Sequence, residues 1–305
     1  GEPETVDLEN MISDTYNEYI QKTPEFKKFQ VSFDAAVEDF KSSIETLNGK
    51  LKNPIVPDKL LDDMKSVLTD TRNGTHIIHM LECLRESSDA TYTHSVSVAV
   101  LCNVIGHWLK YSEEDIRNLT LAGMLHDIGK TTIPSAIIDK PSRLTPAEFE
   151  IIKSHPQNGY NLLIDQHLNS HILNATLMHH ERIDGSGYPR GLKGSQIDDF
   201  AQIVAIADVY IAMINPRVYR RKNCPFDAMS VFEQEGYQMF SPRILLPFLA
   251  GMANTYVNAT VVLSDDSVGE IILIDSQHIT RPMVKVGNAF VDLKKHPNLH
   301  IQSVL

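Results

Sequence analysis

The stretch GMLHDIGK, residues 123–130, ends an apolar run with a histidine and an aspartate side by side. Leu125 and Ile128 flank this pair, so the sequence predicts that His126 and Asp127 are buried. Burying a carboxylate is costly unless it is paired or bound to a metal. A carboxylate can bridge two cations, whereas an imidazole binds one. The pair is therefore a candidate for the centre of a metal site.

Further candidate ligands lie at the inner edges of other apolar segments that are predicted to be helical. They are His94 in TYTHSVSVAV, His155 in IIKSHPQNGY, His179 and His180 at the end of NATLMHH, and Asp208 in FAQIVAIADVYIAMI. Taken singly, each also fits a hydrogen-bonded core histidine or a capped aspartate. Together with the His-Asp pair they make seven nitrogen and oxygen ligands, which favours a dinuclear site inside a helical domain. None is a cysteine, which indicates a hydrolytic rather than a structural metal.

Composition and charge narrow the class of protein. The chain has 305 residues, 42% of them hydrophobic and 22% charged, which is typical of a soluble globular protein. Its formal charge is 28 − 39 = −11, which argues against binding to a nucleic acid polymer. Cys83, Cys102 and Cys224 show no paired spacing and indicate a reducing, cytoplasmic location without disulfides. No apolar run approaches about 20 residues and no leader pattern opens the chain, so we expect no membrane segment.

The pattern of apolar residues predicts a mainly α protein in three parts. Residues 1–80 are predicted to be an N-terminal helical region that either packs on the main domain as a lead-in or serves sensing and dimerisation, forming a homodimer. Residues 81–255 are predicted to be a helical domain that contains the candidate ligands. Residues 256–305 are rich in β-branched residues and are predicted to form a small antiparallel β appendage with turns at SDDS (264–267) and VGNA (286–289).

Two local signals predict helix boundaries. An apolar stripe with helical spacing starts at Phe33 and continues to Leu47, with Gly49 as its stop. The sequence Thr145-Pro146-Ala147-Glu148 predicts a helix start, since it combines an N-cap, a proline at the first helical position and an acid at the third.

Four motifs carry a resemblance to a known family. They are HDIGK at 126–130, the histidine at 155, HHERIDGSGYP at 179–189 and DVYIAMINPRVYR at 208–220. With these motifs, residues 80–250 resemble the HD-GYP family, a branch of the HD phosphohydrolases. The resemblance implies an HD-type helical bundle core and a phosphodiesterase that hydrolyses cyclic di-GMP to pGpG, GMP or both. The C-terminal β segment is similar to a tail found in some members.

The resemblance also implies a ligand set for two divalent transition metals, iron or manganese. One metal would be held by His94, His126, Asp127 and Asp208. Asp127 would bridge to the second, which is held by His155, His179 and His180. Some members bind a third metal through a glutamate four residues before the first histidine. Ala90 occupies that position here and cannot ligate, so we expect two metals.

Candidate catalytic and substrate-binding residues follow from the same motifs. Besides Asp127 they include Lys130, which we expect to contact the substrate phosphate unless it is a solvated helix-end lysine. Asp184 is a candidate to orient the nucleophile, to protonate the leaving group or to cap its loop, and Tyr188 offers a ring and a hydroxyl to a nucleotide. Arg217 and Arg220 resemble the family's ligand-binding positions, with a solvated loop as the alternative.

One departure from the family bears on activity. The chain has DVYIAMIN where the family usually has DVYDALTS, so Ile211 and Ile214 replace polar residues near Asp208. Position 211 is one turn from Asp208 and is predicted to project to a similar face. Loss of polar neighbours weakens a metal site. We therefore predict an active but slow enzyme. A weakly active or inactive cyclic di-GMP sensor and an HD hydrolase of another cyclic dinucleotide are the alternatives.

Overall fold

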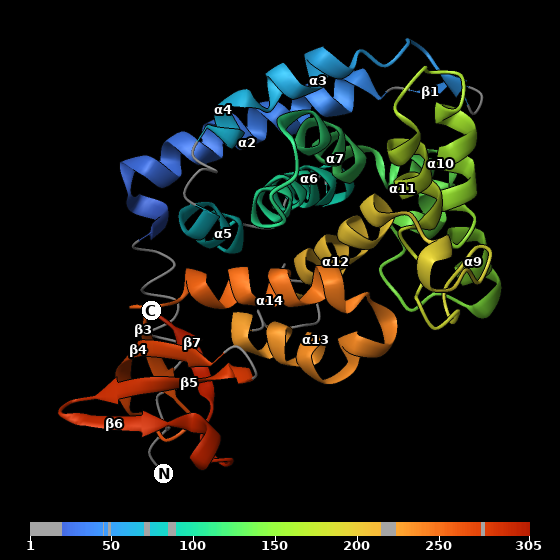
Figure 1. The fold of residues 1–305 in the computed structure, drawn as a ribbon. Helices are drawn as coiled ribbons and strands as arrows, with labels where there is room; N and C mark the ends of the chain where they lie inside the picture. The colour runs from blue at the N-terminus through green and yellow to red at the C-terminus, as the bar shows by residue number, and fades with distance from the viewer. Residues whose placement is uncertain are drawn as a thin grey trace, which may run out of the picture.

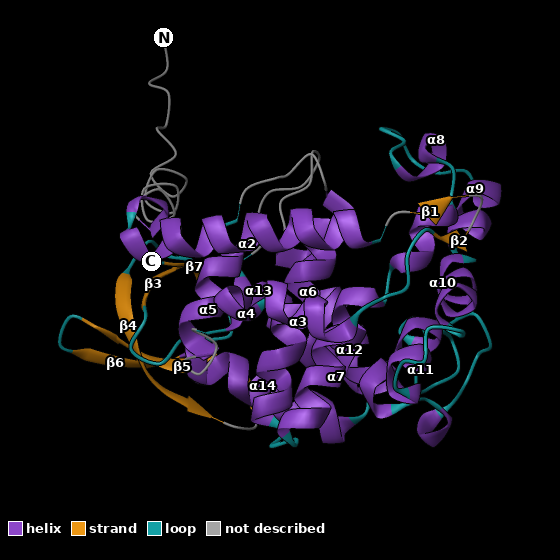
Figure 2. Cartoon of the chain, turned by 90° about the horizontal axis from the view of Figure 1, so that it is seen from above, coloured by secondary structure: helices purple, strands orange, loops and turns teal. Residues whose placement is uncertain are grey.

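The computed structural model describes residues 20–44, 46–47, 50–69, 74–84, 90–214, 224–275 and 278–305. Within these ranges the chain forms packed helices followed by a small antiparallel sheet (Figure 1). Seen from above, the strands of this sheet gather at one end of the molecule, beside the helices (Figure 2). The structure confirms the predicted fold class, a mainly α protein with a helical core and a C-terminal β appendage.

The N-terminal elements lie over the central helices. They are α2 (Pro24–Ser43), β1 (Thr46–Leu47), β2 (Lys50–Leu51), α3 (Pro57–Asp63), α4 (Lys65–Leu68) and α5 (Gly74–Glu82). α2 starts where the Thr23 hydroxyl accepts the N–H of Phe26 at 3.2 Å. Its buried stripe, which includes Phe33, packs against α3, α4 and the central helix α6 (Ala90–Trp108). This arrangement fits the lead-in alternative for residues 1–80.

The predicted extension of this first helix to Leu47 is wrong. α2 ends at Ser43, and the pair Thr46–Leu47 forms a short antiparallel hairpin with Lys50–Leu51. The sequence between these strands is Asn48-Gly49, a dipeptide typical of two-residue hairpin turns. Gly49, the predicted stop, lies outside the described residues.

Three central helices pack against one another and form most of the core. They are α6, α7 (Glu113–Leu125) and α12 (Asp199–Ile214). α6 is buried without a break from Ser95 to Gly106, which requires neighbours on every face. α7 and α12 pack against α6 and against each other. All three helices contribute candidate metal ligands, so these side chains enter the core rather than the surface.

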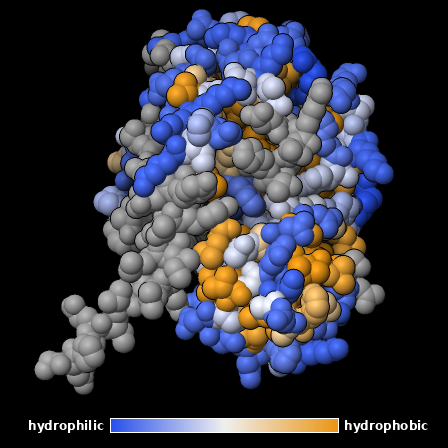
Figure 3. All heavy atoms as spheres, turned by 90° about the vertical axis from the view of Figure 1, so that its left-hand side faces the viewer, coloured by the Kyte–Doolittle hydropathy of each residue, from blue (hydrophilic) through white to orange (hydrophobic). Residues whose placement is uncertain are grey.

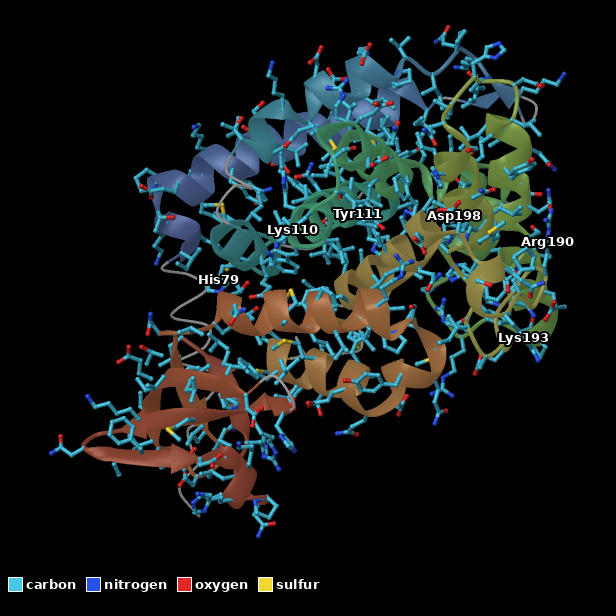
Figure 4. All side chains as sticks on the ribbon, in the orientation of Figure 1. His79, Lys110, Tyr111, Arg190, Lys193 and Asp198 are labelled. Atoms are coloured by element: carbon cyan, nitrogen blue, oxygen red, sulfur yellow. The ribbon has the colours of Figure 1, made fainter. Side chains whose placement is uncertain are left out.

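The other helices surround this core. They are η1 (Ile128–Thr132), α8 (Ser135–Ile138), α9 (Pro146–Ile152), α10 (His155–Leu163), α11 (Ser170–Met178), η2 (Gly194–Gln196), α13 (Pro225–Met239) and α14 (Pro242–Thr255). The predicted start of α9 is confirmed, because Thr145 and Glu148 form a reciprocal capping box. Asp198, labelled in Figure 4, accepts the N–H of Phe200 at the start of α12 and hydrogen bonds from His171 and Asn174 of α11. These contacts tie α11 to α12.

The C-terminal sheet has five antiparallel strands in the order β6-β5-β4-β3-β7. They are β3 (Thr260–Leu263), β4 (Val268–Asp275), β5 (His278–Val286), β6 (Ala289–Asp292) and β7 (Ile301–Val304); a short η3 (Leu293–Lys295) follows β6. Both predicted turns separate strands, as expected. The carboxylate of Glu233 on α13 accepts hydrogen bonds from Ile279 and Thr280, which docks β5 on the helices. Figure 3 shows apolar groups among the polar ones on this part of the surface; Phe290 is 64% exposed.

A buried polar cluster joins three distant segments. The carboxylate of Glu82, at the end of α5, accepts hydrogen bonds from the hydroxyls of Tyr210 on α12 and Tyr256 after α14. The ring of His79, labelled in Figure 4, stacks on Tyr256 with 5.1 Å between centroids. Burial, followed by the charge of Glu82, raises the pKa of both tyrosines, so their hydroxyls remain donors. The cluster holds α12, which carries Asp208, against α5 and the start of the sheet.

The crossing of α6 and α7 allows a stability prediction. A Cβ added at Gly123 would lie 2.9 Å from the Cα of Ala99 and 3.0 Å from the Sγ of Cys102. Gly123→Ala should therefore lower the free energy of unfolding by about 1–2 kcal/mol, because overpacking exceeds the gain in helix propensity. Urea denaturation measures the change. Arg117→Ala, on the exposed side of α7, is the control and should change stability by less than about 1 kcal/mol. Equal effects would contradict the close crossing.

Candidate metal centre

The structure brings all seven predicted ligands together. They lie on five helices or directly after them. His94 lies on α6, His155 at the start of α10 and Asp208 on α12, while His126 and Asp127 follow α7, and His179 and His180 follow α11. Most of these side chains are buried, and those of His126 and His179 are fully so. Helix ends far apart in the sequence therefore meet at one point in the core.

One group of ligands lies on the α6 side. Ligand atoms of His94, His126 and Asp127 all lie within 4.8 Å of one another. Asp208 joins them, because its Oδ1 is 2.8 Å from Nε2 of His94 and 3.9 Å from Nε2 of His126. This is the set that the resemblance implies for the first metal.

The second group lies on the α10 and α11 side. Ligand atoms of Asp127, His155, His179 and His180 lie within 4.8 Å of one another. Oδ1 of Asp127 is 3.2 Å from Nε2 of His155 and 3.8 Å from Nε2 of His179. Asp127 thus belongs to both groups, as a bridging ligand must.

Backbone carbonyls select the tautomer of three histidines. Nδ1 of His126 lies 2.7 Å from the carbonyl oxygen of Gly123, and Nδ1 of His155 lies 2.7 Å from that of Ile152. Nδ1 of His179 lies 3.0 Å from the carbonyl oxygen of Thr176. A carbonyl only accepts hydrogen bonds, so Nδ1 carries the proton. In a neutral ring this leaves the lone pair on Nε2, and in all three residues Nε2 points into the centre.

The centre contains polar atoms that the protein itself does not satisfy. Nε2 of His126 and Oδ1 of Asp127 are buried and make no hydrogen bond of acceptable geometry, although each has a charged or ring neighbour at 3.2 Å. Nε2 of His155 also faces Nε2 of His179 at 3.2 Å, where two neutral rings would oppose their lone pairs. Cations between these atoms would satisfy all of them. The donor set therefore fits two metal ions that prefer nitrogen and oxygen ligands.

Electrostatics hold four of the ligands in the states that metals bind. Burial, with the neighbouring histidines, lowers the pKa of His179, and burial lowers the pKa of His180 to about 3. Burial opposes ionisation of Asp127 and Asp208, but the surrounding cationic groups and hydrogen bonds outweigh it and keep the pKa of both carboxyls low. His126 differs. Burial lowers its pKa, but the adjacent Asp127 carboxylate and other partners outweigh burial, so the pKa of His126 is raised overall.

The loop after His180 is built around a buried acid that the sequence analysis missed. The carboxylate of Glu181 accepts the N–H groups of Arg190 and Leu192 at 2.7 and 2.9 Å. Gly187 passes so close to the chain that an added Cβ would lie 2.4 Å from the carbonyl of His180. A single acid in a polar loop gave no signal of burial. These contacts fold the loop back on the two histidines that precede it.

Arg182 is a second residue that the sequence analysis missed. It donates to the carbonyls of His179 and Glu181 at 3.0 and 2.8 Å, and its guanidinium lies over the ring of Phe240. Burial lowers its pKa. Arg182 thus braces the end of α11 from behind the ligands, and ties it to the segment between α13 and α14.

The substrate-binding candidates fall in three places. Nζ of Lys130 is 2.5 Å from Oδ2 of Asp127, so Lys130 lies at the centre rather than in solvent. The ring of Tyr188 stacks on that of His180, with 4.7 Å between centroids. Arg217 and Arg220 lie outside the described residues.

Asp184 occupies an exposed turn of the loop. Its Oδ1 accepts hydrogen bonds from the backbone N–H and the hydroxyl of Ser186 at 2.8 and 2.6 Å. These bonds lower the pKa of its carboxyl. Such a group is a poor proton donor, so the contacts fit the loop-capping alternative.

Two further positions bear on the sequence predictions. Ala90, at the third-metal position, is exposed at the start of α6. Ile211 is fully buried on the side of α12 that also carries Tyr210 and Ile214, whereas Asp208 lies on the less buried side with Ala212. Three residues advance the helix by about 300°, so the two side chains are about 60° apart, and Ile211 belongs to the apolar core.

Comparison with known proteins identifies the fold and its family. The family profile described as "HD domain" matches residues 79–244, more than half of the chain and all seven ligands. This chain belongs to the HD domain family. A solved HDG"Y"P protein from Bdellovibrio bacteriovorus has the same fold, with a TM-score of 0.60 and 17% identity over 78% of this chain and 76% of that one. The predicted HD-type bundle is confirmed.

Curated relatives narrow the family. This chain is 36% identical to a cyclic di-GMP phosphodiesterase of Pseudomonas aeruginosa over 205 residues, which are 67% of this chain and 49% of the relative. It is 36% identical to a 3'3'-cGAMP-specific phosphodiesterase of Vibrio cholerae over 51% of this chain and 36% of that protein. These similarities confirm the resemblance to HD-GYP proteins. The chain spans about half the length or less of the curated relatives that it matches.

One further finding concerns membranes. None of the helices within the described residues has both the length and the apolar character needed to cross a bilayer.

Metal content tests the shared carboxylate. Protein loaded with metal should hold about two ions per chain, and Asp127→Ala should lose most of both because one side chain serves both groups. His94→Ala removes a ligand from one group only and should keep about one ion. Elemental analysis after gel filtration measures this, with circular dichroism to show that each variant is folded. His171→Ala, which changes a histidine outside the centre, should keep both ions. Equal retention in the Asp127 and His94 variants, or a third stoichiometric ion, would overturn this assignment.

The lowered pKa of His180 predicts how stability depends on pH without metal. An unfolded histidine titrates near 6.5, so below that pH the unfolded chain binds more protons and folding stability falls. At pH 5 this residue alone should cost about 2 kcal/mol relative to pH 7. His179 acts in the same direction, and the raised pKa of His126 acts in the opposite one.

Chemical denaturation in a chelator between pH 7.5 and 5 measures this dependence. The stability of the wild type should decline over that range, and His180→Gln should flatten the decline. An unchanged slope in the variant would show that His180 is not buried in its neutral form.

Proposed function

We propose that this protein is a metal-dependent phosphodiesterase that hydrolyses cyclic di-GMP to pGpG, GMP or both. One observation carries the proposal: Asp127 is shared by two groups of buried ligands in an HD domain. The names of the curated relatives support a cyclic dinucleotide as substrate. In this proposal residues 81–255 are the catalytic domain, residues 1–80 a helical lead-in, and residues 256–305 a β appendage. The predicted cytoplasmic location is part of the proposal.

In this proposal the residues of the centre hold two metal ions. His94, His126, Asp127 and Asp208 would hold one ion, and Asp127, His155, His179 and His180 the other. When bound, two divalent cations supply Lewis acidity that activates water and offsets phosphoryl charge. Histidine and carboxylate donors without a thiolate suit iron or manganese, which we propose as the metals. Carbonyls that receive Nδ1–H direct the Nε2 atoms of His126, His155 and His179 inward, and burial keeps His179 and His180 neutral.

Three groups of the chain would bind the substrate. The ammonium of Lys130, already beside the Asp127 carboxylate, is placed to pair with a phosphate oxygen that enters the centre. The Tyr188 ring holds His180 by stacking and leaves its hydroxyl for the nucleotide. Arg217 and Arg220 remain proposed ligand contacts on the strength of their motif. Asp184 is assigned to the loop rather than to proton transfer.

A second candidate function differs in the substrate alone. The similarity to a 3'3'-cGAMP-specific phosphodiesterase favours a mixed guanine–adenine cyclic dinucleotide as the alternative substrate. The metal centre does not distinguish the two, because it acts on the phosphodiester that they share. The proposal includes no homodimer, since the comparisons lend that prediction no support.

Product analysis tests the proposed activity. Protein purified without oxygen and loaded with iron(II) or manganese(II) should convert cyclic di-GMP to linear product, followed by chromatography. Asp127→Asn should abolish conversion, and His171→Ala should leave it within about twofold, since it lies outside the centre. Conversion of 3'3'-cGAMP but not cyclic di-GMP would favour the second candidate. Tight binding of cyclic di-GMP without product over hours would replace the enzyme by a sensor.

The position of Ile211 allows a separate prediction. Ile211→Asp would place an unpaired carboxylate in the apolar core, so it should lower stability by several kcal/mol. It should not raise turnover, because the side chain lies on the buried side of α12. Thermal unfolding and turnover of the variant, with Ile211→Val as control, measure both effects. A faster and equally stable Asp variant would show that position 211 faces the centre after all.

A further inference from the structure

A line of stacked and charged groups leads outward from the metal centre. The ring of Tyr188 stacks on the ligand His180, with 4.7 Å between centroids and an interplanar angle of 23°. Nζ of Lys153 lies 5.7 Å from the centroid of Tyr188 and 5.6 Å from that of Phe149. The ammonium of Lys153 therefore lies within cation–π range of one ring beside the centre and one ring farther out.

The outer end of this line is exposed although it is apolar. Phe149 is 48% exposed, and α9, which carries it, buries none of its residues. The helix is held by its capping box and by the ion pair of Lys140 with Glu148, rather than by a hydrophobic core. Packing within the protein thus leaves about half of Phe149 in contact with water, at the end of the line that is farthest from the centre.

The same turn of α9 presents a donor and an acceptor next to each other. Nζ of Lys153 forms an ion pair with Oε1 of Glu150 at 2.7 Å, and the side chain of Glu150 is 68% exposed. A ring, a carboxylate and an ammonium therefore lie on one short segment. Arg190 and Lys193, labelled in Figure 4, are at the same end of the molecule and add positive charge there.

We infer that Phe149, Glu150 and Lys153 bind a guanine base of the substrate, an inference that rests on the proposed phosphodiesterase function. The base stacks on the exposed face of Phe149, as bases commonly do on aromatic side chains. Lys153 donates a hydrogen bond to O6, and the Glu150 carboxylate accepts from N1–H and from the 2-amino group. The ion pair remains intact, because each of its partners has unused hydrogen-bonding capacity.

This arrangement explains how the chain would choose among cyclic dinucleotides. Guanine offers two adjacent donors to a carboxylate, whereas adenine offers only its 6-amino group, and hypoxanthine lacks the 2-amino group. The metal centre acts on the diester and is indifferent to the base. Discrimination must therefore come from side chains outside it, and α9 is the exposed element that continues from the ring stacked on His180.

Stacking is tested by changing Phe149. Phe149→Ala should raise the Kd and the KM for cyclic di-GMP about tenfold. The kcat, the metal content and the hydrolysis of methyl p-nitrophenyl phosphate should stay within about twofold. Phe149→Tyr should restore affinity, because it keeps the ring. Phe290→Ala, which removes an exposed phenylalanine from the β appendage, is the matched control and should leave the Kd unchanged.

Base reading is tested with cyclic di-GMP, cyclic di-AMP and the cyclic dinucleotide of inosine monophosphate. Glu150→Gln should reduce the preference for cyclic di-GMP over the inosine analogue by about tenfold, because the carboxylate no longer accepts two hydrogen bonds. Lys153→Met should weaken binding of both oxo-purine compounds and spare cyclic di-AMP. Circular dichroism and metal content show that the variants are folded and loaded.

The outcomes separate this inference from the proposed function. A wild type that cleaves the small diester but neither binds nor cleaves any cyclic dinucleotide would refute the proposed function. A wild type that cleaves cyclic di-GMP, with unchanged Kd in Phe149→Ala and unchanged selectivity in Glu150→Gln, would refute the base site alone. A loss of affinity that Phe149→Tyr does not restore would assign the ring to helix stability instead.

Discussion

The buried carboxylate of Asp127 is the constraint on which the arrangement of the helical domain depends. It is almost fully inaccessible to water and lies between two groups of histidines and beside the ammonium of Lys130. A lone carboxylate in such a place would be strongly destabilising. The cost is offset because cationic or metal-binding groups surround it on every side. Those groups come from several different helices, so the charge can be compensated only when the helices are assembled.

The rest of the domain can be understood as support for that assembly. Glycines allow the close approach that the ligands require: a Cβ at Gly129 would lie 1.9 Å from the carbonyl of His155, which fixes the HD pair against α10. The carbonyls of Gly123, Ile152 and Thr176 orient the imidazoles. Behind the centre, Glu82 ties α12 to α5 and to the residue that precedes the sheet. Apolar burial supplies most of the stability, and these polar contacts determine the positions of the ligands.

Around this rigid centre lies a more open rim with a different composition. The loop from Glu181 to Lys193 is held by backbone hydrogen bonds to a buried acid, and α9 is held by its cap and an ion pair. The protein has a net charge of −11, but Arg190 and Lys193 lie at this end of the molecule, where an anionic substrate would approach. In the proposed function, chemistry at the centre and selection at the rim would be carried by separate elements. That separation fits a family whose relatives act on different cyclic dinucleotides.

The sequence by itself identified the seven side chains that meet at the centre, because acids and histidines within apolar helical stripes are conspicuous where no polar residue is expected. It also determined the helix start at Thr145 and both turns of the sheet, which depend on residues adjacent in the chain. Only the tertiary structure decided what depends on distant neighbours. Ile211 lies in the apolar core, Lys130 pairs with Asp127, and the burial of Glu181 follows from a loop that folds back on itself. Local pattern specifies which face of a helix is apolar, but the partner that meets each face is set by packing between segments far apart in the sequence.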